Sequence, residues 1–308
     1  MIGKMSFKEH PPQPEAIDAP IHVPVLLEAS LNVLKPQLGE SYLDLTAGYG
    51  GHAGAFLKVT KNYSNSYLVD RDERAIATLQ SFSDQGTALL NEDFVAAAQR
   101  LVENGKQFDI VLADLGVSSP QLDIAERGFS FTHDGPLDMR MDRRQDLTAE
   151  KLVNTARADE LVDIICRYGE EPRGFAKIVA SAIIDARPLG STRELADLVK
   201  SVYRGRWKKI HPATRTFQAL RIAVNQELRQ VELLLPLLPK LLKSGGRVGV
   251  ISFHSLEDRL VKQYFRSEAD AGYEAQLEVI TKKPYDGATY DVHNPRSRSA
   301  KLRAAVKK

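Results

Sequence analysis

Cysteine is nearly absent from this chain of 308 residues, which contains one, Cys166. A single thiol excludes an intramolecular disulfide and a metal site built from several cysteines. It is typical of a reducing compartment, so we expect a cytoplasmic protein. Long apolar runs are missing as well, because the most hydrophobic stretch, 233–242, contains Pro236, Pro239 and Lys240. We therefore expect no membrane span and no membrane partner.

Charge of either sign is in little excess, since 42 Lys and Arg face 40 Asp and Glu, for a net charge of +2. This balance does not by itself indicate a polyanionic partner, so nucleic-acid binding has to be argued from local clusters of basic residues. The N-terminus lacks the apolar core of a signal peptide, because residues 8–20 include four prolines and four charged side chains. We expect residues 1–20 to form a disordered tail.

Strand-like and helix-like segments alternate through the first third of the chain. Strands are expected at 41–45, 66–69, 87–90 and 108–113. Helices are expected between them, at 51–60, 72–80 and 94–103. This alternation predicts an α/β fold with a parallel, doubly wound sheet, in which ligands bind at the carboxyl ends of the strands.

The alternation then stops. From 148 to 203 only helical patterns occur, and one long amphipathic helix is predicted from Phe217 to Leu235, where apolar residues recur at steps of three and four. A fifth strand follows at 247–251. We therefore expect a discontinuous sheet domain, residues 21–120 and 215–308, interrupted by a helical insertion, residues 121–214, that contributes to substrate binding.

A glycine-rich turn, in the sequence YLDLTAGYGGH from Tyr42, follows the first predicted strand. Its glycines would let backbone N–H groups approach a ligand closely. The segment from Gly48 to Ala53 matches the G-x-G-x-x-G/A pattern, and Asp70 ends the next strand, where a carboxylate would bind a ribose diol. The turn predicts an NAD site or an S-adenosylmethionine (SAM) site, unless it is only a structural turn.

Asp44 favours SAM between these two cofactors. Its carboxylate would attract the methionyl ammonium of SAM and repel the pyrophosphate of NAD. A second polar segment, DIVLADLGVSSPQLD from Asp109, is a buried strand that ends at Asp114 and continues into a polar loop. In a doubly wound sheet this loop would open onto the same cleft as the glycine turn.

Further motifs accompany this loop along the chain. They are HVPVL from His22, RGFSF from Arg127, GPLDMRMD from Gly135, FHSLED from Phe253 and NPRSRS from Asn294. Together they closely resemble the bacterial RsmH (MraW) family, over nearly everything from 22 to 303. The resemblance implies a class I SAM-dependent methyltransferase with an inserted all-helical domain. Its implied reaction is methylation at N4 of one specific cytidine near the decoding centre of the small-subunit (16S) rRNA.

The resemblance also implies a partner and a set of cofactor contacts. The partner would be the rRNA within the assembled 30S subunit, and a homodimer is left open. The family's SAM contacts map onto Gly50, Gly51, His52, Asp70, Phe94, Asp114 and Gln121. These roles agree with the residue types, because a helix N-terminus suits the methionyl carboxylate and Phe94 offers a flat apolar face to adenine.

Methylation of an amine needs no covalent step, whereas methylation at carbon 5 of cytosine normally needs a thiolate. Cys166 lies in a helical pattern outside the sheet motifs, and we interpret it as structural. The amine needs orientation and a hydrogen-bond acceptor as it attacks the methyl group in line. We predict Asp114 in that role, with Ser118 and Ser119 as secondary polar contacts. The alternative is that Asp114 only holds SAM.

The remaining polar motifs carry weaker predictions. His22, His52 and His254 lack metal-ligand spacing, so we expect no metal site. The segment from His254 to Asp258 follows a strand and could line the active site. Alternatively, Ser255 and Asp258 fit the N-terminal capping box of a helix.

RNA contacts are predicted where basic and aromatic residues cluster, because cations bind phosphate and rings stack on bases. The residues are Arg204, Arg206, Trp207, Lys208, Lys209 and Arg215, and in the basic C-terminal stretch Arg296 and Arg298. A solvated surface is the alternative for that stretch. A pocket for an extruded cytosine is also expected. Two other functions stay open: an NAD-linked oxidoreductase and a non-catalytic RNA-binding or assembly factor.

Overall fold

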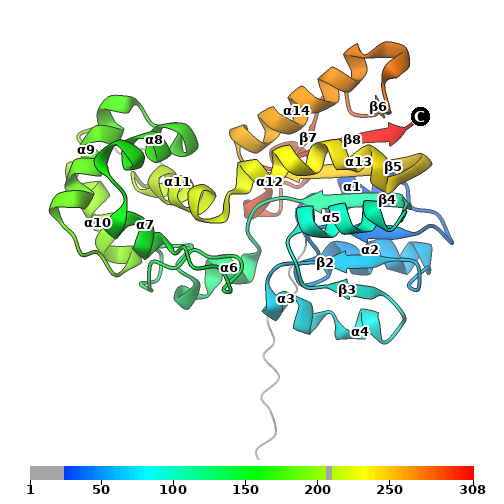
Figure 1. The fold of residues 1–308 in the computed structure, drawn as a ribbon, viewed down its shortest axis with the longest axis horizontal. Coiled ribbons are helices and arrows are strands. Elements are labelled where there is room, and N and C mark those ends of the chain that lie inside the picture. The colour runs from blue at the N-terminus through cyan, green and yellow to red at the C-terminus, as the bar shows by residue number, and fades with distance from the viewer. Residues whose placement is uncertain (1–23, 206–209) are drawn as a thin grey trace, which may run out of the picture.

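The computed structural model describes residues 24–205 and 210–308 (Figure 1). The expected tail, His22 and four predicted RNA contacts lie outside the described residues; the four are Arg206, Trp207, Lys208 and Lys209. The described chain forms a sheet covered by helices on both faces and a helical lobe beside it (Figure 1). No helix in the described ranges is long and apolar enough to cross a bilayer.

An eight-stranded sheet forms the larger part of the molecule. Its strands are β1 (Tyr42–Asp44), β2 (Tyr67–Val69), β3 (Ala88–Leu90), β4 (Phe108–Asp114), β5 (Leu242–Ser252), β6 (Leu277–Val279), β7 (Tyr285–Asp286) and β8 (Lys301–Lys307). Their order is β3-β2-β1-β4-β5-β8-β6, with β7 beside β8. Strands β1 to β5 are parallel, while β8 is antiparallel to its three neighbours. The predicted doubly wound α/β class is confirmed, and the strand order reverses between β1 and β4, where such sheets bind ligands.

Helices cover both faces of the sheet (Figure 1). They are α1 (Leu27–Leu34), α2 (Gly51–Thr60), α3 (Glu73–Thr78), α4 (Gln80–Ser83), α5 (Phe94–Glu103), α12 (Glu227–Leu234), α13 (Leu238–Leu241), α14 (Ser255–Asp270) and α15 (Gly287–Tyr290). Successive side chains of β4 pack in hydrophobic clusters on opposite faces of the sheet. Val111 packs with α5 and with α12 to α14, whereas Ile110 packs with α1 and α2. Because helices cover both faces, both sets of side chains are buried, and β4 is apolar along nearly its whole length.

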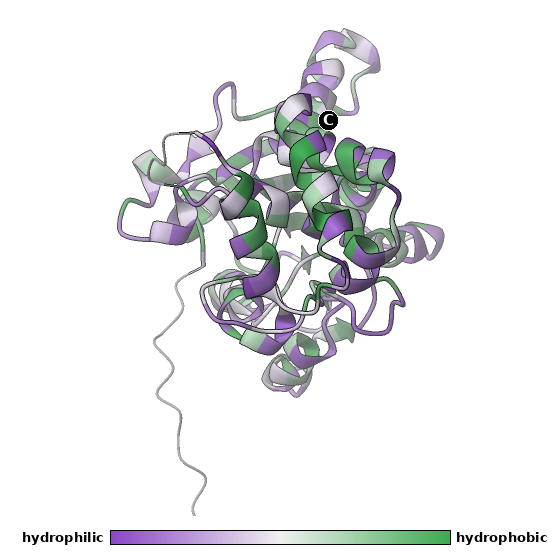
Figure 2. Ribbon diagram, turned by 90° about the vertical axis from the view of Figure 1, so that its left-hand side faces the viewer, coloured by the Kyte–Doolittle hydropathy of each residue, from purple (hydrophilic) through white to green (hydrophobic). Residues whose placement is uncertain are grey.

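The helical lobe has a hydrophobic core of its own, from Phe129 to Val224. Its helices are α6 (Ser119–Asp123), α7 (Ala149–Thr155), α8 (Ala158–Gly169), α9 (Arg173–Asp185), α10 (Thr192–Val202) and α11 (Thr214–Asn225). Apolar and polar residues alternate along the helix ribbons in Figure 2, as expected for helices with one buried face. Cys166 is half-buried on α8 and packs against this core. The packing groups α11 with the lobe, although residues from 215 onward were expected with the sheet.

The prediction of one long helix from Phe217 to Leu235 is wrong. Gln226 has a φ of 51° and separates α11 from α12. At the break, the Asn225 amide donates to the Met139 carbonyl, and its oxygen accepts from the Met141 N–H. The apolar pattern runs through the break because each helix has a buried face, but α11 packs in the lobe and α12 on the sheet.

The C-terminal stretch is not simply a basic surface segment, because β8 lies inside the sheet between β5 and β6. Arg303 on this strand is only 8% exposed, and its Nε donates to Asp258 Oδ1 at 2.7 Å. Strands β6, β7 and β8 were not predicted. Basic residues interrupt β8, and a buried carboxylate on α14 compensates the charge of Arg303.

Candidate active site

A cavity of about 700 Å³ lies at the carboxyl ends of β1, β2 and β4. Segments that follow these strands form its first wall, and α11, α12 and the start of α14 form its second wall. Eight of the predicted cofactor-binding and catalytic residues line it: Gly51, His52, Asp70, Phe94, Asp114, Ser118, Ser119 and Gln121. Gly50 caps α2 next to them, with a φ of 80°.

The glycine turn is packed tightly against the protein itself. A Cβ added to Gly51 would lie 2.4 Å from Pro24 Cγ, and one added to Gly50 would lie 2.8 Å from carbons of Leu79 and Phe82. Side chains at these positions would therefore displace the turn from its place at the start of α2. The glycines are needed for this packing in addition to the predicted approach of a ligand.

Asp70 is held in a fixed orientation at the end of β2. Its Oδ2 accepts a hydrogen bond from the Gly48 N–H, and its Oδ1 accepts one from the Asp72 N–H, both at 2.8 Å. Burial raises the pKa of Asp70 above its ordinary value. Each oxygen keeps a further lone pair, so the carboxylate can accept hydrogen bonds from two hydroxyls of a diol.

A buried network joins the segment after β2 to the loop after β4, and sequence reasoning missed its two charged members. Arg127 Nη1 lies 2.5 Å from Asp72 Oδ2, and both side chains are almost fully buried. The same oxygen accepts from Gln121 Nε2 at 3.2 Å, and Gln121 Oε1 accepts from the Ser118 N–H. Arg127 belongs to the RGFSF motif, but the sequence does not indicate that Asp72 is its partner.

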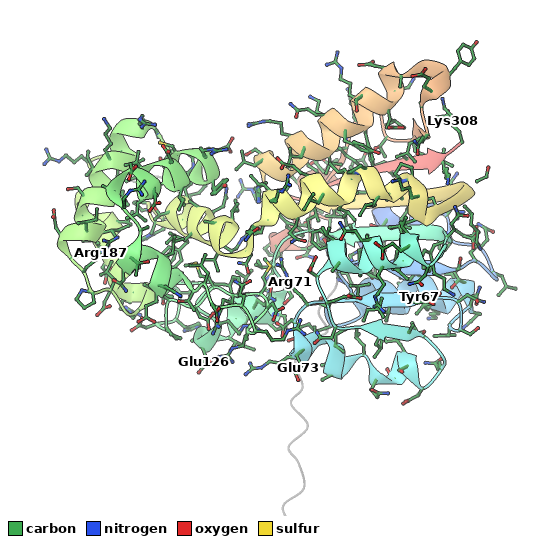
Figure 3. All side chains as sticks on the ribbon, viewed as in Figure 1. Tyr67, Arg71, Glu73, Glu126, Arg187 and Lys308 are labelled. Atoms are coloured by element: carbon green, nitrogen blue, oxygen red, sulfur yellow. The ribbon has the colours of Figure 1, made fainter. Side chains whose placement is uncertain are left out.

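Arg71 lies where the helical lobe meets the sheet (Figure 3). Its guanidinium donates to Met141 Sδ at 2.7 Å, and the residue lines the cavity. Burial lowers the pKa of Arg71 from its ordinary value, and nearby carboxylates, Glu227 first among them, oppose this effect. A cation therefore stands between the two walls.

Asp114 ends β4 between the two walls. Its Oδ2 lies 3.6 Å from Nδ1 of His52, whose Nε2 donates to the Val25 carbonyl at 3.1 Å. Burial raises the pKa of Asp114 well above its ordinary value, and the charges of Asp44 and Glu257 raise it further. Asp114 Oδ1 is buried and has no hydrogen-bond partner among the described residues. The carboxyl group is thus able to hold or accept a proton beside the glycine turn.

Asp44 is not among the described residues that line the cavity. It is 1% exposed, and its carboxylate accepts from the Tyr42 hydroxyl at 2.8 Å and from the Thr46 N–H at 3.1 Å. The side chain therefore supports the glycine turn from behind. Asp44 thus does not line the cavity with Asp70 and Asp114, although its charge helps to raise the pKa of Asp114.

Asp44 is expected to make the folded protein lose stability as the pH rises. Burial raises its pKa from 3.8 to about 7, so the folded state binds more protons than the unfolded chain between these values. Its contribution is present below a pH of about 4 and is lost as the pH rises towards 7, by at most about 1.4 kcal/mol per unit. Urea unfolding of Asp44→Asn over this range should give a flatter profile than the wild type. An equally steep profile would contradict this role.

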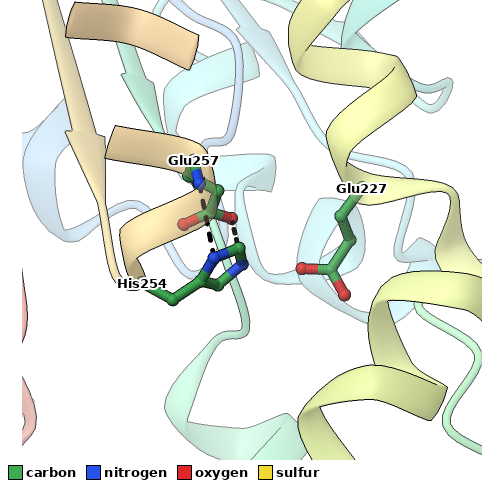
Figure 4. A group of neighbouring side chains, drawn as sticks. All are labelled: Glu227, His254 and Glu257. Carbon is green, nitrogen blue, oxygen red and sulfur yellow. Dashed lines mark hydrogen bonds and ion pairs between the residues drawn. The ribbon is translucent and has the colours of Figure 1, made fainter. Parts of the chain in front are cut away.

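The second wall carries an ion-pair network. Arg221 donates from Nε and Nη2 to the two oxygens of Glu227, at 2.9 and 2.8 Å. Glu257 Oε2 accepts from the Phe253 N–H at 2.8 Å, and its Oε1 lies 3.3 Å from His254 Nε2 (Figure 4). The sequence assigned no role to Glu227 and indicated Glu257 only as part of a segment that could line the active site, because α12 and α14 are brought together only by the fold.

The predicted capping box of Ser255 and Asp258 is wrong by one residue. His254 is the N-cap of α14, and its Nδ1 accepts from the Glu257 N–H at 3.4 Å. Asp258 instead binds Arg303 on β8.

Two glutamates and a histidine meet at the second wall. Ligand atoms of Glu227, His254 and Glu257 lie within 4.8 Å of one another (Figure 4). Such a set can bind a metal ion or hydrogen-bond a polar ligand.

The structure describes four of the predicted RNA contacts: Arg204, Arg215, Arg296 and Arg298. Arg204 and Arg298 are exposed, and Arg215 lies 3.9 Å from Glu171. Arg296 lines the cavity and donates to both oxygens of Asp123 on α6, at 2.6 and 2.8 Å. Arg296 therefore joins the C-terminal segment to the loop after β4.

The family model of the MraW methylase family matches residues 19–308. Ribosomal RNA small subunit methyltransferase H of Cyanothece sp. is 47% identical over 291 residues, which cover 92% of this chain and 94% of the relative. The protein of the same name from Acidobacterium capsulatum is 45% identical over 298 residues, which cover 93% and 98%. These matches confirm the resemblance and the class I methyltransferase fold. The chain belongs to the MraW methylase family, a family of SAM-dependent methyltransferases.

Proposed function

We propose that this protein transfers the methyl group of SAM to N4 of one cytidine in the rRNA of the small ribosomal subunit, in the cytoplasm. The observation that carries the proposal is the placement of Asp114, whose buried Oδ1 lacks a hydrogen-bond partner among the described residues. It stands between a wall with the predicted SAM contacts and a second polar wall. Relatives that cover nearly the whole chain are named as small-subunit rRNA methyltransferases.

The first wall fits SAM. The N-terminus of α2 suits the methionyl carboxylate, and the lone pairs of Asp70 suit the two ribose hydroxyls. Phe94, which is 9% exposed and lines the cavity, offers its ring to adenine. SAM would supply an electrophilic methyl group. Gln121, held by Asp72 and Ser118, would limit the movement of the cofactor at the loop after β4.

Asp114 accepts a hydrogen bond from the target amine and orients it for in-line attack. The nitrogen forms its bond to carbon as the carbon–sulfur bond breaks, and the proton it then loses passes to Asp114. The sulfonium charge of bound SAM would favour the ionised form of this carboxyl, which burial otherwise disfavours. No covalent enzyme intermediate is required. Cys166 lies on α8 and does not line the cavity.

We assign substrate binding to the helical insertion together with the basic residues beside it. Arg204 is exposed near the end of α10, so it is available to bind phosphate in the assembled 30S subunit. Replacing Arg204 by Ala is expected to weaken subunit binding and to reduce the slope of log affinity against log salt by about one. Filter binding at several salt concentrations measures both quantities. An unchanged slope would remove Arg204 from the interface.

Small subunits from a strain that lacks this gene provide the direct test. Incubation with tritiated SAM should label them, and nucleoside mass spectrometry should place the added methyl on N4 of a cytosine. A label on another atom would refute the proposed target, and no label would leave a non-catalytic RNA-binding or assembly factor as the better interpretation. Parallel incubation with NAD should produce no bound cofactor.

A further inference from the structure

Two polar atoms that lack hydrogen-bond partners line the same cavity. Among the described residues, six buried side-chain atoms have no hydrogen-bond partner. Only Asp114 Oδ1 and His254 Nε2 belong to residues that line the cavity. Buried polar groups are normally paired, since an unpaired one costs about 1–3 kcal/mol. These two atoms therefore point to a ligand that supplies the missing partners.

The hydrogen-bonding character of His254 follows from its place at the start of α14. Nδ1 accepts the Glu257 N–H as the cap of the helix, so in the neutral ring the hydrogen is on Nε2, which is a donor. The side chain is 8% exposed, and Glu257 Oε1 lies 3.3 Å from Nε2 without the alignment of a hydrogen bond. The ring is thus held in place with a donor still available to a ligand.

Asp114 supplies the complementary group, because an ionised carboxylate only accepts. Asp114 pairs with Ile251 on β5, three residues before His254, which places the end of β4 near the start of α14. An acceptor and a donor in one cavity match the pairing edge of cytosine, where the N4 amine donates beside the N3 acceptor. Uracil has the reverse order, with an acceptor at O4 and a donor at N3, so the same pair would reject it.

We propose that the second wall is the subsite for the target base and that His254 Nε2 selects cytosine by donating a hydrogen bond to N3, while Asp114 accepts from N4. This inference rests on the proposed function and adds the residue that discriminates between pyrimidines. Enzymes that act on a base extruded from RNA read its pairing edge in this way. Phe253 also lines the subsite, and its ring contacts the loop at Gly116.

A metal ion is less well matched to the same side chains. Both oxygens of Glu227 accept from the Arg221 guanidinium, so a cation already neutralises this carboxylate. Ligation through His254 Nε2 would need the hydrogen on Nδ1, which would remove the cap of α14. A neutral ligand that accepts a hydrogen bond requires neither change.

His254→Asn tests the inference, because Asn can still cap α14 while it lacks the reach of Nε2. Small subunits are rebuilt around transcripts with cytidine or uridine at the methylated position, and their affinities are measured in the presence of S-adenosylhomocysteine. The wild type should prefer cytidine by about tenfold to a hundredfold. The variant should lose most of this preference, with its affinity for uridine subunits and for SAM unchanged. His293→Asn, the same change at an exposed site, should keep the preference.

A preserved preference in His254→Asn would overturn the inference, as would equal affinity of the wild type for both subunits. Loss of SAM binding by the variant would show a structural role instead. The wild type is also dialysed against EDTA. If it then loses its preference for cytidine and regains it when Zn²⁺ is added, a metal ion and not a hydrogen bond from His254 selects the base. Failure of the proposed function is seen separately, because wild-type protein would then leave no methyl group on a cytosine N4.

Discussion

Replacement of Asp114 by Asn is expected to lower the rate of methyl transfer about 10²–10⁴-fold in a single turnover on small subunits. Asn has the shape of Asp but cannot take the proton that the amine loses. The affinity for SAM should change little, because the first wall supplies the other predicted contacts, from Asp70, Phe94 and Gln121. Single-turnover transfer and equilibrium binding of SAM, measured on the same preparation, separate these effects.

The pH dependence of the rate gives a second measure of Asp114. A proton acceptor must be ionised, and burial holds the pKa of this carboxyl well above its ordinary value. The wild-type rate should therefore rise with pH through that pKa, whereas the Asn variant should lack this rise. A variant that loses SAM binding in proportion to its rate would show that Asp114 only holds the cofactor. One that transfers methyl at the wild-type rate would exclude it from the chemistry.

Replacement of Arg127 by Ala is expected to lower the free energy of unfolding by about 3–5 kcal/mol. The change leaves the buried Asp72 carboxylate without its cation and removes the donors to the carbonyls of Arg140 and Met141. Because Asp72 also holds Gln121, the affinity for SAM should fall as well. Chemical denaturation and SAM titration measure the two effects.

Arg157→Ala is the matched control, because its ion pair with Asp159 is exposed on both sides. Exposed pairs contribute little, so the denaturation midpoint of this variant should stay close to that of the wild type. A small effect of Arg127→Ala would mean that Asp72 becomes protonated or hydrated without its partner. A double variant, Arg127→Ala with Asp72→Asn, should regain part of the lost stability, since it leaves no unpaired buried charge.

The helices and strands that a local sequence pattern specifies could be predicted. The helices at 51–60 and 94–103 have those bounds in the structure. The first begins directly after the glycine turn, and the second begins after Asp93, whose side chain caps it. The strands before them were also found. In contrast, β8 contains three basic residues, which do not suggest a buried strand. Arg303 is buried in the folded protein because Asp258 on α14 compensates its charge.

The candidate site also contains residues that the sequence could place and residues that it could not. The glycine turn, Asp70 and Asp114 directly follow predicted strands, so the sequence could place them at one edge of the sheet. His254, Glu257 and Glu227 come from two helices that only the tertiary fold brings together. The contact of Asp44 with the cofactor stays a prediction, although its carboxylate already accepts hydrogen bonds from Tyr42 and Thr46.

The chain passes between the sheet and the helical lobe twice, after β4 and again at Gln226. Both passages lie beside the cavity: the first carries Ser118 and Gln121, and the second is bridged by Arg221 and Glu227. Both chain connections between the lobe and the sheet therefore lie close to the cavity. A tilt of the lobe relative to the sheet would therefore change the spacing between Asp114 and the part of the second wall that α11 supplies.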